Sequence, residues 1–227
     1  MKDHLQNKKR SNAPTSTSRR RFMQATLAVP VLLTLSGRAF ASANIHKLHG
    51  QVFINNRPAD LGSRITAGSK IVVSHDGELA FSIGGDAFLL KGGTAVELVG
   101  GTTLSSLRLL TGSMLASLGT RNKPFHLVSS MAIVAVRSGA VYLSAKPHRL
   151  YTWTRYGESE LRFGRQRQQI STSLDMAYEI VPDPAASHGA NMAGMSLHSM
   201  QVMEQMDDEL RMLESWVGRV PAFDRQP

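Results

Sequence analysis

Short apolar segments separated by turn residues dominate the middle of the chain, residues 68–142. Each segment has four to seven residues rich in Val, Ile, Leu and Phe. The breaks between the segments contain Asp-Gly, Gly-Gly or Pro, and lie at 75–77, 84–86, 92–93, 100–101 and 122–124. Glycine adopts the positive φ that tight hairpin turns require, so such breaks are typical of turns between antiparallel strands. Because no helical period interrupts the series, the pattern predicts an all-β fold, a roll or sandwich of short antiparallel strands.

Strand-like segments extend this β region on both sides. Before it, residues 50–58 form an apolar segment that runs into a turn. After it, residues 150–163 are dense in aromatic side chains and then alternate between polar and apolar, which is the two-residue period of a half-buried strand. We therefore expect one β domain at residues 45–170 with its core at 68–142.

The C-terminal part of the chain changes to a helical period. Residues 171–196 contain Pro-Asp-Pro and Ser-His-Gly among small residues, which is typical of a linker. Apolar side chains then recur every three or four positions until Gly218 and Pro221 end the pattern. We expect an amphipathic helix at 197–218 with an acidic polar side and an apolar side that packs on the β domain or on a partner. Its apolar positions are Met200, Met203, Met206, Leu210, Leu213 and Val217.

The first 41 residues have the organisation of a secretory signal. Basic and polar residues lead into Ser-Arg-Arg-Arg-Phe-Met, and an apolar run follows. The paired Arg19 and Arg20 followed by Phe22 resemble the signal motif of the twin-arginine (Tat) pathway, whose apparatus exports proteins that are already folded. We therefore expect the chain to be exported through the Tat system to the periplasm of a bacterium.

An apolar run and small residues complete this signal. The run covers eleven residues, 25–35, and contains Pro30, whereas a helix needs about 20 apolar residues to span a bilayer. Ala39 and Ala41 have the spacing of a small-residue cleavage site. We expect cleavage after Ala41, with cleavage after Ala43 as the alternative. A retained signal would tether the protein to the membrane.

The formal net charge of +9 at pH 7 is concentrated in the signal. Residues 1–43 hold eight basic residues and one acidic residue, and the rest of the chain holds 18 basic and 16 acidic residues, a net charge of +2. A nucleic-acid-binding protein carries its positive charge on the folded domain, so we expect no nucleic-acid partner. No later segment is long and apolar enough to cross a membrane, so we expect no transmembrane span in the mature chain.

Three motifs of glycine and apolar residues in the β region are similar to those of a known family. They are Ala67-Gly68-Ser69, the Leu-x-Leu-Leu-x-Gly step at 107–112 and Val-Arg-x-Gly-x-x-Tyr at 136–142. This region, about a third of the chain, resembles the FecR domain. In that family the domain lies in the bacterial periplasm, where it is the sensory part of regulators that relay a receptor's state to an inner-membrane anti-sigma segment. The resemblance implies binding and signalling rather than catalysis.

The chain departs from those regulators at its N-terminus. A FecR regulator joins its external β domain to a cytoplasmic anti-sigma helix through a transmembrane span. In this chain the signal replaces that arrangement. We therefore do not expect the chain to contact a cytoplasmic sigma factor by itself or to control transcription directly.

Two further segments resemble a group of exported proteobacterial proteins with a FecR domain. That group has a Tyr-x-Cys-x-Cys-Tyr-Gly strand and ends in His-Thr-Asp-x-Glu-Leu-x-x-Leu-Glu-x-x-Val-Gly-Arg-x-Pro-x-Phe. Here the Cys positions hold Trp153 and Arg155, and the His position holds Gln205. The chain has no cysteine, which excludes disulfides, thiolate nucleophiles and iron–sulfur ligation. The matching positions are Tyr151, Tyr156, Gly157, Asp207, Glu209, Leu210, Leu213, Glu214, Val217, Gly218, Arg219, Pro221 and Phe223.

Methionines near the C-terminus raise a copper-binding hypothesis. Their thioethers recur at one-turn spacing beside two histidines, and thioethers favour Cu(I). Because Leu210, Leu213 and Val217 continue the same stripe, we favour packing, for which methionine is well suited. We therefore expect no metal and no cofactor. The residues concerned are Met192, Met195, Met200, Met203, Met206, His188 and His198. His46 and His49 are a second candidate metal pair, but their flanking residues do not favour a helix.

Three histidines, His75, His126 and His148, are the candidate bases for an enzyme. None has a Gly-x-Ser-x-Gly or His-Glu-x-x-His companion, and the paired glycines lie at hairpins rather than in a phosphate loop ahead of a helix. An unrecognised hydrolase would have to unite one of these histidines with a serine and a carboxylate in a deep pocket. We expect no catalytic residue.

A basic and aromatic cluster follows the β core. Arg162, Arg165 and Arg167 lie near Tyr156 and Phe163 in the sequence, a mixture that can bind single-stranded nucleic acid or an anionic glycan. Glutamates interleave with these arginines, so we favour a solvated strand and turn.

These observations predict a non-catalytic, FecR-like binding or interaction module of the periplasm. The expected partner is a protein or peptide in the periplasm or at the envelope, bound through strand edges, loops or the acidic helix. The alternatives are a periplasmic copper-binding protein that uses the Met-rich C-terminal segment, and an unrecognised hydrolase.

The signal motif yields a direct test. Changing Arg19 and Arg20 together to Lys should leave the full-length precursor in the cytoplasm, because the Tat apparatus recognises the arginine pair. Immunoblots of cytoplasmic and periplasmic fractions measure this, with Arg10→Lys as a control outside the motif. Normal processing of the double variant would show that Tat is the wrong route.

Overall fold

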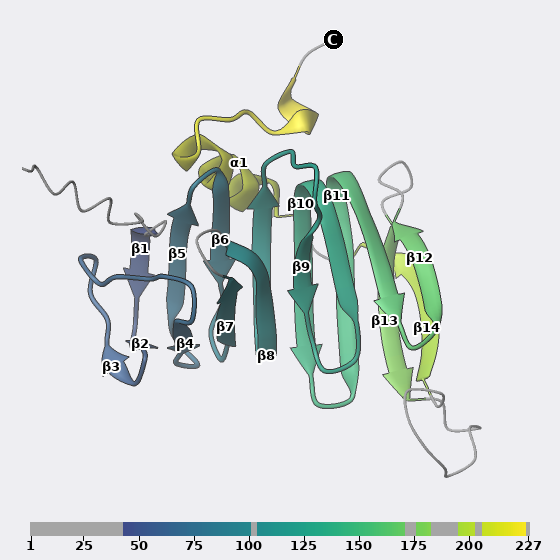
Figure 1. The fold of residues 1–227 in the computed structure, drawn as a ribbon, viewed down its shortest axis with the longest axis horizontal. Coiled ribbons are helices and arrows are strands. Elements are labelled where there is room, and N and C mark those ends of the chain that lie inside the picture. The colour runs from purple at the N-terminus through teal and green to yellow at the C-terminus, as the bar shows by residue number, and fades with distance from the viewer. Residues whose placement is uncertain (1–42, 101–103, 171–175, 183–194, 203–205, 226–227) are drawn as a thin grey trace, which may run out of the picture. The chain divides into compact units, whose positions relative to one another are not determined.

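The computed structural model describes residues 43–100, 104–170, 176–182, 195–202 and 206–225, and all structural statements below concern these residues (Figure 1). They form antiparallel strands with one short α-helix near the C-terminus, so the predicted all-β fold is confirmed. The elements are β1 (Asn44–His49), β2 (Val52–Ile54), β3 (Arg57–Pro58), β4 (Lys70–Val73), β5 (Glu78–Ile83), β6 (Asp86–Leu90), β7 (Ala95–Gly100), β8 (Leu104–Leu118), β9 (Phe125–Val128), β10 (Ile133–Lys146), β11 (Arg149–Phe163), β12 (Gln166–Ile170), β13 (Met176–Pro182), β14 (Met195–Gln201), α1 (Asp207–Trp216) and the 3₁₀ helix η2 (Ala222–Asp224).

Three strands are longer than the sequence pattern predicted. β8 and β11 have 15 residues and β10 has 14, because each continues from one sheet into another. The C-terminal half of β8 pairs with β6 and β10, and its N-terminal half pairs with β7 and with β9, which runs parallel to it. The described strands form one continuous hydrogen-bonded sheet that these long strands divide into two parts. We call the part β1-β5-β6-β8-β10-β11-β13-β14 the first sheet and the part β3-β2-β4-β7-β8-β9-β10-β11-β12 the second sheet.

Two facing glycines allow β10 and β11 to bend together between the sheets. Gly139 and Gly157 are register partners with φ values of 106° and 95°, which side chains other than glycine rarely adopt. A Cβ atom at Gly139 would lie 1.8 Å from the carbonyl oxygen of Tyr156, and one at Gly157 would lie 2.0 Å from that of Ser138. The two backbones therefore approach too closely for any side chain at this corner.

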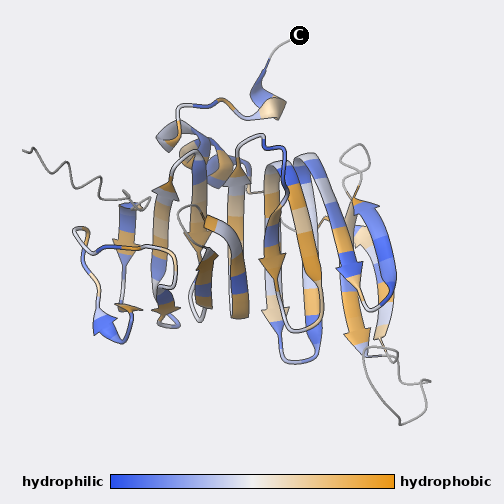
Figure 2. Cartoon of the chain, viewed as in Figure 1, coloured by the Kyte–Doolittle hydropathy of each residue, from blue (hydrophilic) through white to orange (hydrophobic). Residues whose placement is uncertain are grey.

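The buried apolar side chains form two clusters. The inner core combines side chains of both sheets, and its centre contains Phe81, Phe88 and Phe125, whose adjacent ring centroids are 5.1 and 6.0 Å apart. The helix-side core covers the other face of the first sheet and includes Leu89, Leu115, Trp153, Leu210 and Leu213. Figure 2 shows β6 of the first sheet as largely hydrophobic and β3 as hydrophilic. The helix α1 therefore covers a face that would otherwise be apolar and open to water.

The predicted helix at 197–218 is wrong over its first part. Residues 195–201 form β14, which pairs antiparallel with β13, and α1 begins only at Asp207. Met195 packs on the inner core and Met200 on the helix-side core, so the two faces of this strand contact different cores. Among the described apolar positions that suggested a helix, Met200 lies in β14, whereas Met206, Leu210 and Leu213 lie in α1 or directly before it. The later part is correct, since α1 ends at Trp216 and Gly218 follows with φ 67°.

The predicted domain limits also change. Met176–Pro182 forms β13, which pairs with β11, so the expected linker at 171–196 contains a strand of the first sheet. The β region thus extends beyond residue 170 to residue 201. The predicted signal at 1–41, with its cleavage site, lies outside the described residues. In the described part of the chain, no helix is long and apolar enough to cross a membrane.

The close backbone approach at Gly139 and Gly157 leads to a prediction about stability. Gly139→Ala should lower the free energy of unfolding by more than about 3 kcal/mol, because β10 and β11 must separate to admit the methyl group at a positive φ. The matched control is Gly62→Ala, where the nearest atom to the new Cβ is the Asp60 Oδ1 at 3.5 Å. Urea denaturation followed by circular dichroism measures both variants. Equal stability of the two would show that the corner has room for a side chain.

Candidate functional site

A row of outward-facing side chains crosses the second sheet from strand to strand. Each member is a register partner of the next on the adjacent strand. Strand alternation puts the row on the face opposite to the buried Val96, Leu107 and Leu161. From β4 to β12 the row contains Lys70, Glu97, Arg108, Val128, Ile133, Arg162 and Arg167. Four of these seven side chains are basic and one is acidic, so this face, which we call the outer face, is cationic.

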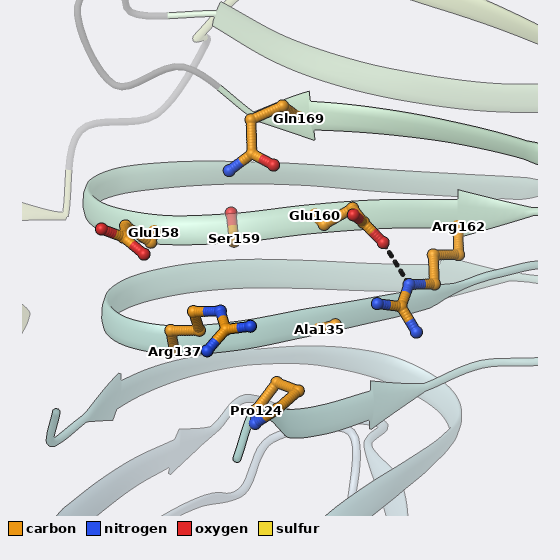
Figure 3. A pocket seen from close by; sticks show the side chains of 8 residues that line it. All are labelled: Pro124, Ala135, Arg137, Glu158, Ser159, Glu160, Arg162 and Gln169. Atoms are coloured by element: carbon orange, nitrogen blue, oxygen red, sulfur yellow. Dashed lines mark hydrogen bonds and ion pairs between the residues drawn. The ribbon is translucent and has the colours of Figure 1, made fainter. Parts of the chain in front are cut away.

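The first of two hollows on the outer face lies between β10, β11 and β12 (Figure 3). It has a volume of about 260 Å³. Arg162 forms an ion pair with Glu160 along one side, and the Arg137 Nη1 donates to the backbone oxygen of Asn122 at 3.2 Å. The hollow is lined by Pro124, Ala135, Arg137, Glu158, Ser159, Glu160, Arg162 and Gln169. Its polar lining suits water and charged groups rather than an apolar ligand.

The second hollow adjoins the first and shares Arg162 with it. It is larger, about 560 Å³. Apolar side chains line part of it, namely Val128, Met131, Ala132, Ile133 and Phe163. Arg165 and Arg167 also line it, and within the described part of the chain neither has an ion-pair partner. This hollow therefore combines apolar surface with uncompensated positive charge.

The electrostatics of the outer face favour an anionic ligand. Burial lowers the pKa of His126, which lies on β9 in this face, and the charge of Arg162 lowers it further. The imidazole is therefore more often neutral at a given pH than an exposed histidine would be. Three of the four cations in the row are guanidinium groups, whose planar donors pair well with carboxylates.

The structure separates the basic and aromatic cluster predicted from the sequence. Arg162, Arg165 and Arg167 lie together at the second hollow, as the sequence suggested. Phe163 is buried, and the Tyr156 hydroxyl donates to a carboxylate on α1. Neither ring is therefore presented for stacking on a base, and stacking is what single-stranded nucleic acid requires.

A second polar cluster, centred on Glu214, holds α1 on the first sheet. The buried Glu214 accepts hydrogen bonds from Ser117 Oγ at 2.6 Å, from the Tyr156 hydroxyl and from Arg219 Nε at 2.5 Å. Arg219 also donates to Ser117 Oγ at 2.6 Å and to the backbone oxygen of Gly85. Burial raises the pKa of Glu214, but the hydrogen bonds outweigh it and hold that pKa below its ordinary value. Glu214 is therefore ionised and fully partnered.

Other acidic side chains of α1 also face the sheet rather than solvent. Asp207 pairs with Arg155 of β11, with oxygen–nitrogen distances of 2.9 and 3.2 Å. Glu209 lies 3.3 Å from the Nζ of Lys91, which also contacts Glu78 at the same distance. These ion pairs bind α1 to its own sheet, so the expectation that its acidic side serves as a docking surface is wrong for these residues. The sequence analysis named Glu214 as a matching position but missed that its side chain is buried and hydrogen-bonded, although its position four residues after Leu210 places it on the buried side of the helix.

The candidate catalytic histidines lie in separate elements. His75 is in the turn after β4, His126 is on β9, and His148 is in the turn between β10 and β11. None of them lines either hollow. His46 instead stacks on Trp216 with ring centroids 4.5 Å apart, and its Nε2 lies 2.7 Å from Ser82 Oγ. Among the described residues, no three His, Asp or Glu side chains are grouped so that they could hold a metal ion.

The structure removes the helical spacing behind the copper hypothesis. Met195 and Met200 lie on β14 and face different cores, and Met206 is buried just before α1. Their thioethers therefore do not form one stripe on a helix. Met192, Met203 and His188 lie outside the described residues.

Comparison with known proteins gives few matches. No known protein-family model matches the chain, and no curated protein matches it. The solved structures to which it is similar include two of a proposed anti-sigma factor from Parabacteroides distasonis. One is 13% identical with a TM-score of 0.49 and 63% of each chain covered, and the other is 14% identical with a TM-score of 0.49 and 64% of each chain covered. The chain thus spans less than two thirds of the length of these proteins.

The Glu214 cluster makes a prediction with a pH dependence. Glu214→Gln should lower the free energy of unfolding by about 3 kcal/mol at neutral pH, because Arg219 loses its buried counter-charge. Since the folded-state pKa of Glu214 lies below the ordinary value of 4.5, its contribution is present above pH 4.5 and is lost as the pH falls further. The difference in stability between wild type and variant should therefore shrink on acidification.

Urea titrations at several pH values measure this difference. Asp208→Asn is the matched control, because that side chain is 96% exposed and pairs only with Arg211 on its own helix. The control should leave the stability nearly unchanged. A stability difference for Glu214→Gln that does not vary with pH would contradict an ionised Glu214.

Proposed function

We propose that this chain is a non-catalytic module that binds a protein or peptide in the bacterial periplasm and serves envelope signalling. The observation that carries the proposal is the outer face, where a cationic row of side chains adjoins two hollows. A sheet face with open charges and edges is suited to recognise segments of another chain. The face combines apolar side chains with polar and charged ones, as interfaces between proteins do.

Sequence features support the location and the role. Arg19, Arg20 and Phe22, followed by the apolar run and by Ala39 and Ala41, support export through the Tat system. The motifs shared with FecR domains support a sensory or signalling role over an enzymatic one. The nearly balanced charge after the signal supports a partner other than nucleic acid.

The geometry does not favour the two alternative functions. A hydrolase needs a histidine that orients a nucleophile, and the three candidate histidines lie in different elements and line neither hollow. A Met-based copper site needs thioethers that converge, and Met195 and Met200 diverge on opposite faces of β14. Binding of a protein segment is the function that remains supported by an observed surface.

The test is capture of the partner by the full chain with a C-terminal tag, expressed in its native host. The protein is purified from periplasmic and membrane fractions after brief crosslinking, and the eluate is analysed by mass spectrometry and for metals. We expect one protein in stoichiometric amount that a tag exported by the same signal does not capture. Stoichiometric copper with no protein partner would overturn the proposal.

A further inference from the structure

The edge strand β12 borders the second hollow. It pairs through Gln166–Ile170 with β11, and within the described part of the chain no strand pairs with its other side. Among the described residues, the backbone groups on that side therefore have no strand partner, as at other sheet edges that can receive a further extended segment. β12 contains no proline, no acidic residue and no irregularity in its register, which are the usual obstacles to pairing at an edge.

Positive charge is concentrated at this edge. Arg162 and Arg167 are register partners on β11 and β12, so two like charges lie directly opposite each other on the outer face. Such a pair is unfavourable for the isolated sheet. Glu160 offsets Arg162, whereas Arg165 and Arg167 have no ion-pair partner among the described residues. An incoming carboxylate would relieve this repulsion.

The second hollow supplies apolar contact beside these charges. Val128, Met131 and Ile133 line it together with the arginines, and Ile133 is one of the large apolar side chains that remain exposed. Side chains of a bound strand point alternately to its two faces. A strand with alternating acidic and apolar residues would place its carboxylates on the outer face beside Arg167 and its apolar side chains on the opposite face, beside Phe163 and Gln166, which also line the hollow. The shape and the charge of this edge therefore fit the same kind of ligand.

We propose that an extended acidic segment of a protein partner binds along β12 and extends the second sheet by one strand. Its backbone pairs with the edge of β12, its carboxylates contact Arg165 and Arg167, and an apolar side chain enters the second hollow. This inference rests on the proposed function, since it names the chemistry of the partner and the strand that receives it.

The experiment uses the full chain and a synthetic probe, a fluorescein-labelled nine-residue peptide in which glutamate alternates with valine. Fluorescence anisotropy gives the Kd. Two control peptides test the two parts of the contact. One replaces every glutamate by lysine, and the other replaces the central valine by proline, which cannot continue strand pairing. Both should bind at least about tenfold more weakly than the probe.

Paired variants of the protein locate the contact. Arg165→Glu with Arg167→Glu should weaken binding of the probe by at least about tenfold, because both contacts become repulsive. The matched control is Arg57→Glu with Arg64→Glu, two exposed arginines outside the row, one in β3 and one between β3 and β4, which change the net charge equally. This control should change the Kd by less than about twofold, since the distant charges are screened. Circular dichroism confirms that both variants fold.

Each other outcome overturns the inference. Failure of the probe to bind would overturn it. Equal weakening of binding by the two double variants would also overturn it, because it would show that the net charge of the protein attracts the probe without a specific site. Equal affinity for the proline peptide would exclude strand pairing, and tighter binding of a single-stranded oligonucleotide than of the probe would assign the face to another ligand. If Arg165→Glu with Arg167→Glu still captures the cellular partner in full amount, that partner binds elsewhere and only the proposed function stands.

Discussion

The close approach of two backbones at Gly139 and Gly157 is the constraint on which the rest of the structure depends. With no side chain at either position, β10 and β11 bend together and pass from the first sheet into the second. The same bend encloses the inner core between the sheets and leaves one outward face on each. One of these faces is covered by α1, and the other presents the arginines and the two hollows.

The bend at Gly139 and Gly157 also positions the side chains that bind α1 to the first sheet. Arg155 and Tyr156 immediately precede Gly157, and they supply the contacts to Asp207 and Glu214 on the helix. The path of β11 through the bend therefore sets the position of two polar groups beneath α1. Apolar burial provides the attraction between helix and sheet, and these directional contacts fix where along the sheet the helix lies. The burial that favours docking also makes an unpartnered Glu214 costly.

The sequence predicted the parts of this structure that depend on local rules. Turns at Gly77, Gly84 and Gly93 separate strands as expected, because the residues that specify a turn lie within a few positions of each other. The length of β8 could not be predicted, because a strand that changes sheets also changes which of its faces is buried. The helix was misplaced at residues 197–201 because pairing with β13 is a non-local contact. Similarly, the arginine cluster could be predicted because its members are close in the sequence. Val128 and Ile133 lie beside these arginines at the second hollow only because of strand pairing.

The helix α1 is synthesised after the strands on which it packs. Its partners lie far upstream, since Glu209 contacts Lys91 across 118 positions and Glu214 contacts Ser117 across 97. A ribosome releases these strands well before it releases the helix. Until the last segment emerges, Leu89, Leu115 and Trp153 present an uncovered apolar surface to the surrounding solution. A nascent chain, or one that has lost its C-terminal residues to a protease, therefore exposes an aggregation-prone apolar surface that α1 covers in the complete protein.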